Sequence, residues 1–538
     1  MGKFFSNMCV FFIILFLFTN NISAQSPVPI IPSEDDRIYP GLYWGAAGIT
    51  KGLLELRSMP HIYDALENEF IPFKLDEIIT KSLNGIWESR MQNFNNQTIS
   101  SWQKVSGADI YPSKKYGAAG IVDIFIEAYL IYNNDTYLQW AESAINELYA
   151  QVQHFSLPHW PYAYPFSRSA TGIYITDISF GSLGIIDSTL NLYMVNKNTT
   201  YLNYAINATQ WLYNISYDTD IDGEINKIIP WYQNDENYSI TYTSYTQGNS
   251  GAIPILIKLA NATNDVKWAD WATFIAKWIL NLQNADGSWV HNPHSTLLTK
   301  YTNFELGIVG IMEGLIHLIS EENISINLTD DLKYQIIDGV EKGTNWLVSS
   351  FISNDTHNIF PIHDLSQYAK YSLYEGMSGI TKYLRMIGNH AIDISSSKIS
   401  SVYLASFDWL KNNAIYYYED GGINLMGFYS STFNEKYSDL SYAYGLVGCA
   451  LELIYIAVYQ FGENYQNYLD PDFLSNIVNT VEYYQLENGL WNRQNYPNFS
   501  IEFPPQIFAL SALLISFIGL IVYQYKIKNQ IEFKLYLD

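Results

Sequence analysis

The sequence predicts an all-α protein, an α/α toroid of seven helical hairpins, and three observations support that fold class. The pattern G-x-x-G followed by an apolar stretch at helical spacing occurs seven times. Successive copies lie 72, 64, 67, 59, 69 and 69 residues apart, and such regularity is typical of repeat architectures. A second, amphipathic helix follows most copies. Because helices that are apolar nearly all round belong inside and amphipathic helices outside, seven inner and seven outer helices would close into a ring.

The N-terminal segment, residues 1–24, has the features of a secretory signal peptide. Lys3 is followed by an apolar stretch from Met8 to Phe18, and small residues end at Ala24, the pattern of a cleavable signal. The apolar stretch is too short to span a bilayer easily. Residues 25–40 are expected to form a linker, and the body of the protein is expected outside the cytoplasm.

The predicted toroid, an ectodomain over residues 41–500, begins each inner helix at a glycine pair. The first glycines of the pairs are Gly45, Gly117, Gly181, Gly248, Gly307, Gly376 and Gly445. The second glycine follows three residues later, on the same helix face. Since glycine has no side chain, neighbouring helices can approach closely at these positions, and we interpret the pairs as architectural. The inner helices then start around one mouth, where free N–H groups and positive dipole ends converge.

Residues just before the glycine pairs are expected to line this mouth, and many of them are aromatic. The candidate ligand-binding residues are Trp44, Tyr116, Phe180, Tyr245, Gln247 and Tyr444. Aromatic rings mixed with a few acids are typical of carbohydrate or peptide clefts, in which rings stack on the ligand and acids hold its polar groups. The alternative interpretation is ordinary packing around a closed ring.

Three carboxylates near the mouth, Asp177, Glu305 and Glu375, are the candidate catalytic residues. Glycoside hydrolysis uses two carboxyl groups roughly 5–10 Å apart, so an acid/base pair among the three would make the protein a glycan-active enzyme. The alternative is that they cap inner helices through hydrogen bonds. Whether the protein is an enzyme is left open by the sequence.

The repeats resemble the lanthionine synthetase C-like (LanC-like) family over roughly residues 40–495. The resemblance rests on the number of repeats, the G-x-x-G-I openings, and the outer-helix stretches "YLQWAESAINEL" and "YLNYAINATQWL". It implies a toroid whose catalytic members use a zinc ion to activate a peptide cysteine thiol for addition to a dehydrated residue. A bound zinc lowers the pKa of such a thiol and holds the thiolate.

At the positions where the resemblance implies zinc ligands, this chain differs from the family. A Cys before the fourth glycine pair is matched by Thr246, and a Cys-His before the fifth is matched by Glu305 and Leu306. The acid/base His of the third repeat is matched by Phe180. These side chains do not form a zinc site, which prefers His and Cys. We therefore expect no zinc and no lanthionine cyclase activity.

The segment "DTDIDGE" resembles the start of a calcium loop, with Asp218, Asp220 and Asp222 as candidate ligands. The twelfth position of the loop is Ile229 instead of the expected Glu, so only half of the motif is present. Calcium is therefore a possible cofactor, and a polar turn after an outer helix is the alternative.

Residues 503–525 form an uncharged stretch that predicts a single transmembrane helix. A helix of that length spans the roughly 30 Å hydrocarbon core, although a buried terminal helix is the alternative. Lys526 and Lys528 follow directly, which favours a cytoplasmic tail over residues 526–538. The predicted location is the cell membrane, with a single pass and the ectodomain outside, where Asn-x-Ser/Thr sites would permit glycosylation.

The net charge and the cysteine count limit the classes of partner and the covalent links that the protein can have. The net charge of −24 argues against nucleic acid, because phosphate binding requires clustered Lys and Arg. Cys449 is the one cysteine outside the predicted signal peptide, so no internal disulfide is expected. The predicted function is binding of an extracytoplasmic peptide or glycan at the mouth without zinc-dependent chemistry; the alternative is a glycosidase-like enzyme that uses the mouth carboxylates.

Overall fold

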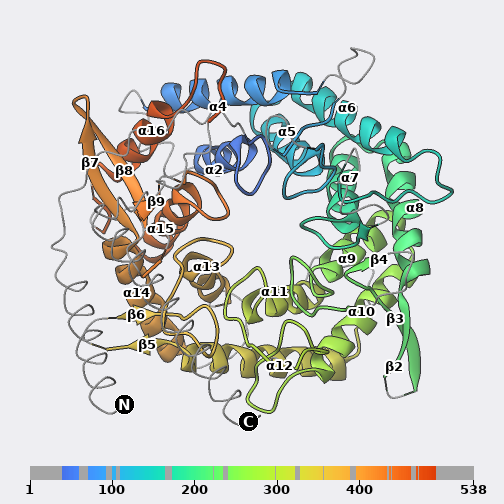
Figure 1. The fold of residues 1–538 in the computed structure, drawn as a ribbon. Helices are drawn as coiled ribbons and strands as arrows, with labels where there is room; N and C mark the ends of the chain where they lie inside the picture. Colours follow the sequence, from blue (N-terminus) through green and yellow to red (C-terminus); the bar gives the residue numbers. More distant parts are fainter. Residues whose placement is uncertain are drawn as a thin grey trace, which may run out of the picture. The chain divides into compact units, whose positions relative to one another are not determined.

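The computed structural model describes residues 39–491, except for gaps at 60–70, 92–99, 105–108, 164–172, 222, 234–239, 297, 321–327, 355–356, 388–395, 430, 433–435, 438, 462–467 and 471. This part of the chain forms a closed ring of helices (Figure 1). The predicted signal peptide (1–24), transmembrane segment (503–525) and tail (526–538) lie outside it, as does most of the linker (25–40). In the described residues, no helix combines the length and the apolar character that crossing a membrane requires.

The described residues contain two concentric rings of helices. The inner helices are α2 (Ala46–Ser58), α5 (Ala118–Tyr132), α7 (Ser182–Asn196), α9 (Ala252–Thr263), α11 (Ile308–Ile319), α13 (Met377–Ile387) and α15 (Leu446–Phe461). The outer helices are α4 (Ile71–Glu88), α6 (Asp135–Gln151), α8 (Thr199–Ile215), α10 (Val266–Asn281), α12 (Asp330–Ser349), α14 (Ser396–Asn413) and α16 (Phe473–Tyr483). The α/α toroid of seven hairpins is therefore confirmed.

The glycine pairs allow each inner helix to start beneath its own preceding loop. A Cβ atom on Gly117 would lie 1.6 Å from the carbonyl oxygen of Tyr111, and one on Gly120 would lie 2.1 Å from that of Lys114. In both cases the carbonyl belongs to the residue six positions earlier, and all seven pairs repeat this contact. The sequence analysis expected the close approach between neighbouring helices, whereas the structure shows it mainly within each repeat.

The second glycine of each pair also lies against a side chain of the preceding repeat. This contact between neighbouring repeats closes the ring. A Cβ on Gly120 would lie 2.8 Å from the Cβ of Leu42, and one on Gly48 would lie 3.3 Å from the Cβ of Tyr442, in the last repeat. The outer helices close as well, since Lys74 Nζ in α4 donates to Asn479 Oδ1 in α16 at 3.0 Å. The first and last hairpins are therefore joined as neighbours.

The first glycine should tolerate no side chain. Gly117→Ala is expected to lower the free energy of unfolding by about 3 kcal/mol, because the added methyl group overlaps a backbone oxygen that cannot move without the loop. Gly339→Ala in α12 is the matched control, since its Cβ would meet the flexible ends of two side chains, Leu280 at 2.6 Å and Gln283 at 3.4 Å, and no backbone atom beyond its own helix within 3.4 Å. Chemical denaturation of both variants measures the difference; equal stabilities would contradict the role assigned to Gly117.

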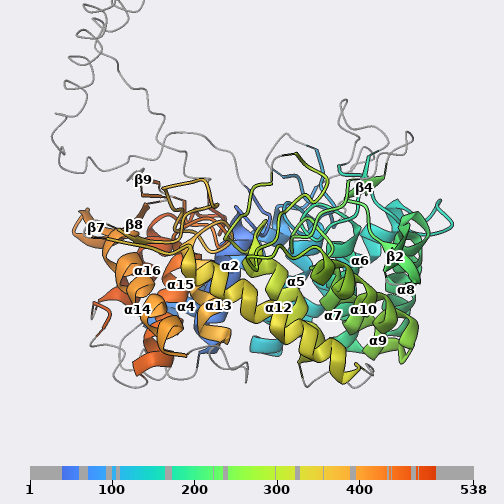
Figure 2. The same cartoon turned by 90° about the horizontal axis from the view of Figure 1, so that it is seen from below.

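Small antiparallel sheets, which were not predicted from the sequence, lie in the segments between the helices. The strands are β1 (Tyr174–Ile175), β2 (Tyr217–Ile221), β3 (Glu224–Ile228), β4 (Tyr232–Gln233), β5 (Ile352–Ser353), β6 (Asn358–Ile359), β7 (Ile415–Asp420), β8 (Ile423–Tyr429) and β9 (Lys436–Tyr437). They pair as β1 with β4, β2 with β3, β5 with β6, and β7-β8-β9. The side view shows that the loops before the inner helices gather on one face of the ring (Figure 2), and this face is the predicted mouth.

Candidate binding site at the mouth of the ring

A belt of backbone hydrogen bonds surrounds the axis where the inner helices begin. It consists of the residue two positions before the first glycine of each repeat. The links run from N–H to carbonyl oxygen, from Tyr43 to Lys115 (3.2 Å), Lys115 to Ser179 (2.8 Å), Ser179 to Thr246 (3.2 Å), Thr246 to Glu305 (3.4 Å), Glu305 to Tyr374 (2.9 Å) and Tyr374 to Ala443 (3.0 Å). Because every repeat makes the same turn, the belt holds one residue of each repeat around the axis.

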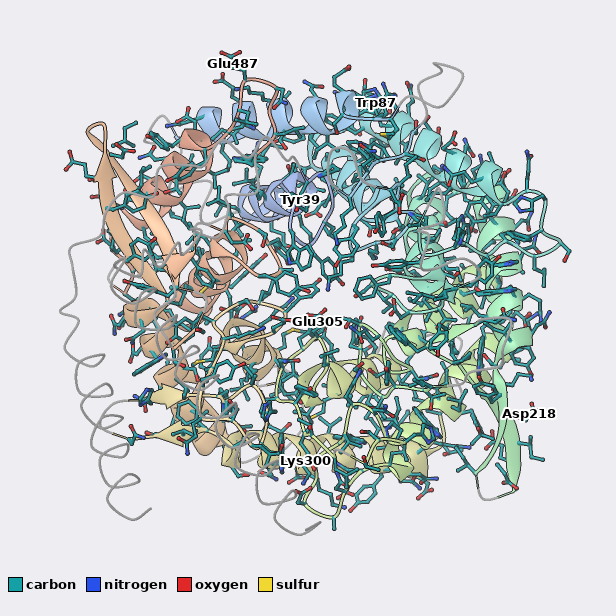
Figure 3. All side chains as sticks on the ribbon, viewed as in Figure 1. Tyr39, Trp87, Asp218, Lys300, Glu305 and Glu487 are labelled. Atoms are coloured by element: carbon teal, nitrogen blue, oxygen red, sulfur yellow. The ribbon has the colours of Figure 1, made fainter. Side chains whose placement is uncertain are left out.

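A buried ion pair crosses this belt. Lys115 Nζ lies 2.9 Å from Glu305 Oε1, and only 6% and 4% of the two side chains are exposed. Tyr444 donates its hydroxyl to the same carboxylate, at 2.9 and 3.0 Å from its two oxygens. Glu305 lies near the centre of the ring (Figure 3). The candidate carboxylate Glu305 is therefore engaged by a cation and a phenol, both from other repeats.

An arc of aromatic rings lies beside the ion pair. Ring centroids are 5.3 Å apart for Trp44 and Tyr116, 5.5 Å for Tyr116 and Phe180, and 5.5 Å for Trp44 and Tyr444. Lys115 Nζ lies 4.8 to 5.4 Å from the centroids of Phe180, Tyr444 and Trp44, a geometry that favours cation–π attraction. Four of the six predicted ligand-binding residues are thus brought together, and we call them the aromatic arc.

The other two predicted ligand-binding residues are not part of the aromatic arc. Tyr245 is three positions before its glycine and packs against Phe304, with ring centroids 4.9 Å apart. It lines a cavity inside the ring of inner helices instead of the mouth. Gln247 is half-buried in its loop. Tyr245 is therefore separate from the aromatic arc, because its position in the repeat faces the other side of the belt, and its role in ligand binding stays a prediction.

Asp177 is enclosed by its own loop. Its Oδ1 accepts the N–H of Phe180 at 2.6 Å, its Oδ2 accepts Trp231 Nε1 at 2.7 Å, and the residue is 1% exposed. Burial raises its pKa to about 7, although the hydrogen bonds and Lys115 oppose this rise. Asn303 makes the same loop bond to the N–H of Leu306 at 2.9 Å, so Asp177 is a loop cap in the structure.

The third candidate carboxylate, Glu375, forms an ion pair of its own. Its carboxylate pairs with Lys370, five residues earlier in the same loop, and both side chains are partly exposed. The three carboxyl groups thus have different nearest partners among the described residues, although Lys115 pairs with Glu305 and also lowers the pKa of Asp177, and Lys370 pairs with Glu375 while Glu305 also raises the pKa of Lys370.

The sequence interpretation selected Glu305 but missed other residues of the belt. Lys115 and Tyr43 belong to the belt, and Tyr43 shares a hydrogen bond of 3.0 Å with Ser179 across it. Lys104 Nζ lies 4.1 Å from the centroid of Tyr116. An alignment of the seven repeats contains the signal for the belt, because its residues all stand two positions before a glycine, whereas five of the six predicted ligand-binding residues stand one position before it.

The side chains at the positions implied for zinc do not fit that metal. The Thr246 hydroxyl donates to the carbonyl oxygen of Glu305 at 2.7 Å, Glu305 pairs with Lys115, and Leu306 has no donor atom. Zinc sites use His, Cys and carboxylate ligands in a tetrahedral arrangement. Within the described ranges, no group of three or more His, Cys, Asp or Glu residues is placed to hold a metal ion.

The segment predicted as a calcium loop or turn is a β-hairpin. Asp218 and Asp220 lie in β2, both exposed, and Asp222 lies outside the described residues. Asp218 Oδ1 is 3.0 Å from Lys227 Nζ, and Asp220 Oδ1 accepts the N–H of Gly223 at 2.8 Å. The two aspartates thus have partners within the hairpin, and calcium binding there stays a prediction.

Among known proteins, similarity to this chain is found in solved structures alone. No family profile and no curated protein matches the chain. Among solved structures it is similar to a nisin cyclase, at 15% identity and a TM-score of 0.47, over 81% of this chain and 94% of that one. It is also similar to a D-mannose isomerase, at 12% identity and a TM-score of 0.46, over 71% of this chain and 97% of that one. It is similar as well to a cellobiose 2-epimerase from Bacillus thermoamylovorans, at 13% identity and a TM-score of 0.42, over 62% of this chain and 86% of that one.

The class of protein is defined by the chain's own helices. Seven inner and seven outer helices in the described residues make it an α/α toroid. The particular family is not shown by these comparisons, and the LanC-like resemblance stays a prediction from the repeats.

Proposed function

We propose that this protein binds an extracytoplasmic glycan or peptide at the mouth of the toroid and does not turn it over. The observation that carries the proposal is the aromatic arc of Trp44, Tyr116, Phe180 and Tyr444 at the starts of four inner helices. Aromatic faces bury the apolar faces of a ligand while leaving its polar groups to other contacts. The proposal includes the predicted cell-membrane anchor and a divergent, zinc-less LanC-like ancestry.

The charged groups near the aromatic arc favour a glycan over a peptide as its occupant. Asp177 is enclosed by its loop, and Glu305 is paired with Lys115. Few free carboxylates therefore remain to hold the amino groups of a peptide, whereas stacking on rings needs no charge on the ligand. The same pairing supports binding in preference to hydrolysis, since catalysis would require a carboxyl group that is free to exchange protons with a substrate.

The proposal predicts that the arc determines ligand capture. The full chain, screened on an array of glycans and peptides, should retain glycans, and Trp44→Ala should weaken that binding about tenfold. Trp346→Ala, on the half-buried face of outer helix α12, is the matched control and should bind as the wild type does. If the array retains the protein on peptides alone, the ligand is a peptide and not a glycan. If Trp44→Ala binds as the wild type does, the aromatic arc is not the binding site.

A glycan-active enzyme is the second candidate function, and the pKa of Asp177 favours it. An aspartic acid with a pKa of about 7 holds its proton near neutral pH, as a general acid must. Turnover of an array glycan, lost in Asp177→Asn, would establish this function in place of pure binding. Release of products that persists in Asp177→Asn would exclude Asp177 as the acid.

A further inference from the structure

A second cavity lies on the other side of the belt from the mouth. Its volume is about 920 Å³, within the range of small-molecule sites, roughly 300–1,000 Å³. The belt residues Tyr43, Thr246 and Tyr374 form one end of it. Leu130 and Met194 also line it and are 64% and 45% exposed, so the far end opens to solvent. We call this cavity the inner chamber.

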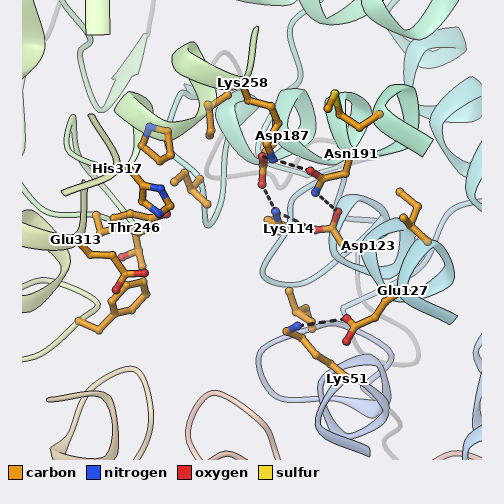
Figure 4. A pocket seen from close by; sticks show the side chains of 18 of the residues that line it. Lys51, Lys114, Asp123, Glu127, Asp187, Asn191, Thr246, Lys258, Glu313 and His317 are labelled. Atoms are coloured by element: carbon orange, nitrogen blue, oxygen red, sulfur yellow. Dashed lines mark hydrogen bonds and ion pairs between the residues drawn. The ribbon is translucent and has the colours of Figure 1, made fainter. Parts of the chain in front are cut away.

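One wall of the inner chamber is a closed cycle of five polar side chains (Figure 4). Lys114 Nζ lies 2.9 Å from Asp123 Oδ2 and also pairs with Asp187. Lys258 Nζ lies 2.5 Å from Asp187 Oδ1 and 2.6 Å from Asn191 Oδ1. Asn191 Nδ2 donates to Asp123 Oδ1 at 2.9 Å, which completes the cycle. Three neighbouring inner helices, α5, α7 and α9, and the loop before α5 contribute these residues.

The formal charges of the cycle sum to zero, and ion pairing stabilises the charged forms of Asp187 and Lys114. Burial alone would raise the pKa of Asp187, but the ammonium groups of Lys114 and Lys258 hold it well below its usual range. Burial alone would lower the pKa of Lys114, but Asp123 and Asp187 hold it above its usual range. Two cations, two anions and one amide therefore form a fixed wall. A ligand with a net charge would have to compete with an existing ion pair.

Next to the cycle, a second ion-pair group continues the polar wall. Lys51 Nζ lies 2.7 Å from Glu55 Oε1 and 3.3 Å from Glu127 Oε2. Tyr442 donates its hydroxyl to Glu55 Oε1 at 2.9 Å. The wall therefore alternates hydrogen-bond acceptors with donors over a long stretch of the inner chamber.

The end of the inner chamber at the belt is aromatic. Tyr245 and Phe304 line it with their ring centroids 4.9 Å apart, and Tyr374 lies 5.2 Å from Phe304 in an edge-to-face arrangement. These rings come from three successive repeats, at positions just before the glycine pairs. An apolar end and a polar wall of ion pairs thus face the same space.

We propose that the inner chamber binds a small neutral saccharide or cyclic polyol. Each hydroxyl group of such a ligand both donates and accepts a hydrogen bond, so it can donate to Asp123 or Asp187 and accept from Lys258 or Asn191 without breaking an ion pair. Hydrogen bonds to ionised partners are the stronger ones. The C–H face of the ring then packs on Tyr245 or Phe304. The inference does not rest on the proposed function, because the aromatic arc lies on the other side of the belt.

Calorimetric titration of the full chain with matched probes tests the proposal. The neutral probes are glucose, cellobiose, trehalose and myo-inositol; glucosamine and glucuronate carry one charge each on the glucose ring, and glycylglycine is a zwitterion. At least one neutral probe should bind with a single-site isotherm. The charged analogues of glucose should bind about tenfold or more weakly than glucose. Tighter binding of glucosamine, glucuronate or glycylglycine, or no binding of a neutral probe, would overturn the proposal.

Three variants place the binding in the inner chamber. Asn191→Leu keeps the size of the side chain, removes its hydrogen bonds, and should abolish measurable binding of the neutral probe. If Asn191→Leu does not fold, Met194→Trp leaves the cycle intact and fills the open end from an exposed position, with the same expected loss. Trp346→Ala, on the half-buried face of outer helix α12, lies outside both the aromatic arc and the inner chamber and should leave the affinity unchanged. Binding that survives Met194→Trp, or that Trp346→Ala abolishes, contradicts the assignment to the inner chamber.

Discussion

Glu305→Gln is expected to lower the free energy of unfolding by about 3–5 kcal/mol, because it leaves the Lys115 ammonium buried without its counter-ion. The substitution keeps the shape of the side chain and an oxygen that accepts from Tyr444, so it isolates the loss of charge. Both members of the pair are almost completely buried, and the aromatic rings around Lys115 replace only part of the lost attraction. Chemical denaturation at pH 7 measures the effect.

The double variant Lys115→Met/Glu305→Gln provides the decisive comparison. With both charges removed, most of the lost stability should return, since an apolar side chain can replace a buried ion pair at little cost. The exposed pair Lys277–Glu224 is the matched control, and Glu224→Gln should change stability by less than about 1 kcal/mol. A double variant as unstable as Glu305→Gln would show that the charge of Glu305 is not the source of the loss.

Asp177→Asn is expected to remove a pH dependence of stability that spans about pH 4 to 7. The ordinary pKa of this group is 3.8, and burial raises it to about 7 in the folded protein. Between these values the folded protein keeps a proton that the unfolded chain releases. Stability from this group is therefore greatest at low pH and is lost as the pH rises through 7. At 1.36 kcal/mol per pKa unit, the change is up to about 4 kcal/mol.

The measurement is the difference in unfolding free energy between wild type and Asp177→Asn at a series of pH values. The asparagine stays neutral and can keep the bond to the N–H of Phe180, as Asn303 does in another repeat. Its altered contact with Trp231 adds a constant offset and no slope. The difference should fall as the pH rises from 4 to 8. A difference that is flat across this range would contradict the raised pKa.

Asp286 supplies a control of opposite sign. Burial raises the pKa of its carboxyl, but the hydrogen bonds from Lys300 and Ser288 and the charge of Lys300 together hold it below the ordinary value. Its contribution is therefore present above the unfolded pKa and is lost as the pH falls. The difference between wild type and Asp286→Asn should rise with pH, whereas that for Asp177→Asn should fall.

The repeat pattern predicted the toroid because the main contact of each glycine pair lies within its own repeat. Each glycine pair meets the carbonyl oxygens of residues six positions earlier, as Gly117 meets Tyr111. Such a contact lies within one repeat, so it appears in the sequence seven times at the same spacing. The number of hairpins and the inner and outer helices followed from that spacing and from the apolar patterns, and the structure confirms them.

The candidate site was predicted only in part. Trp44, Tyr116, Phe180 and Tyr444 do gather in the aromatic arc, because the repeat fixes their position. Tyr245 lies on the other side of the belt, since a shift of two positions in the loop reverses the side that a residue faces. The small sheets were missed because their strands are short and lie between helices.

The sequence by itself determined what is repeated: seven hairpins, glycines at the start of each inner helix, and aromatic residues beside them. Only the tertiary structure decided which side chains meet across the ring. Lys115 and Glu305 are 190 residues apart, and the residues of the polar cycle come from three inner helices and one loop. Those contacts form only when the ring has closed and brought different repeats together, so no spacing within one repeat could encode them.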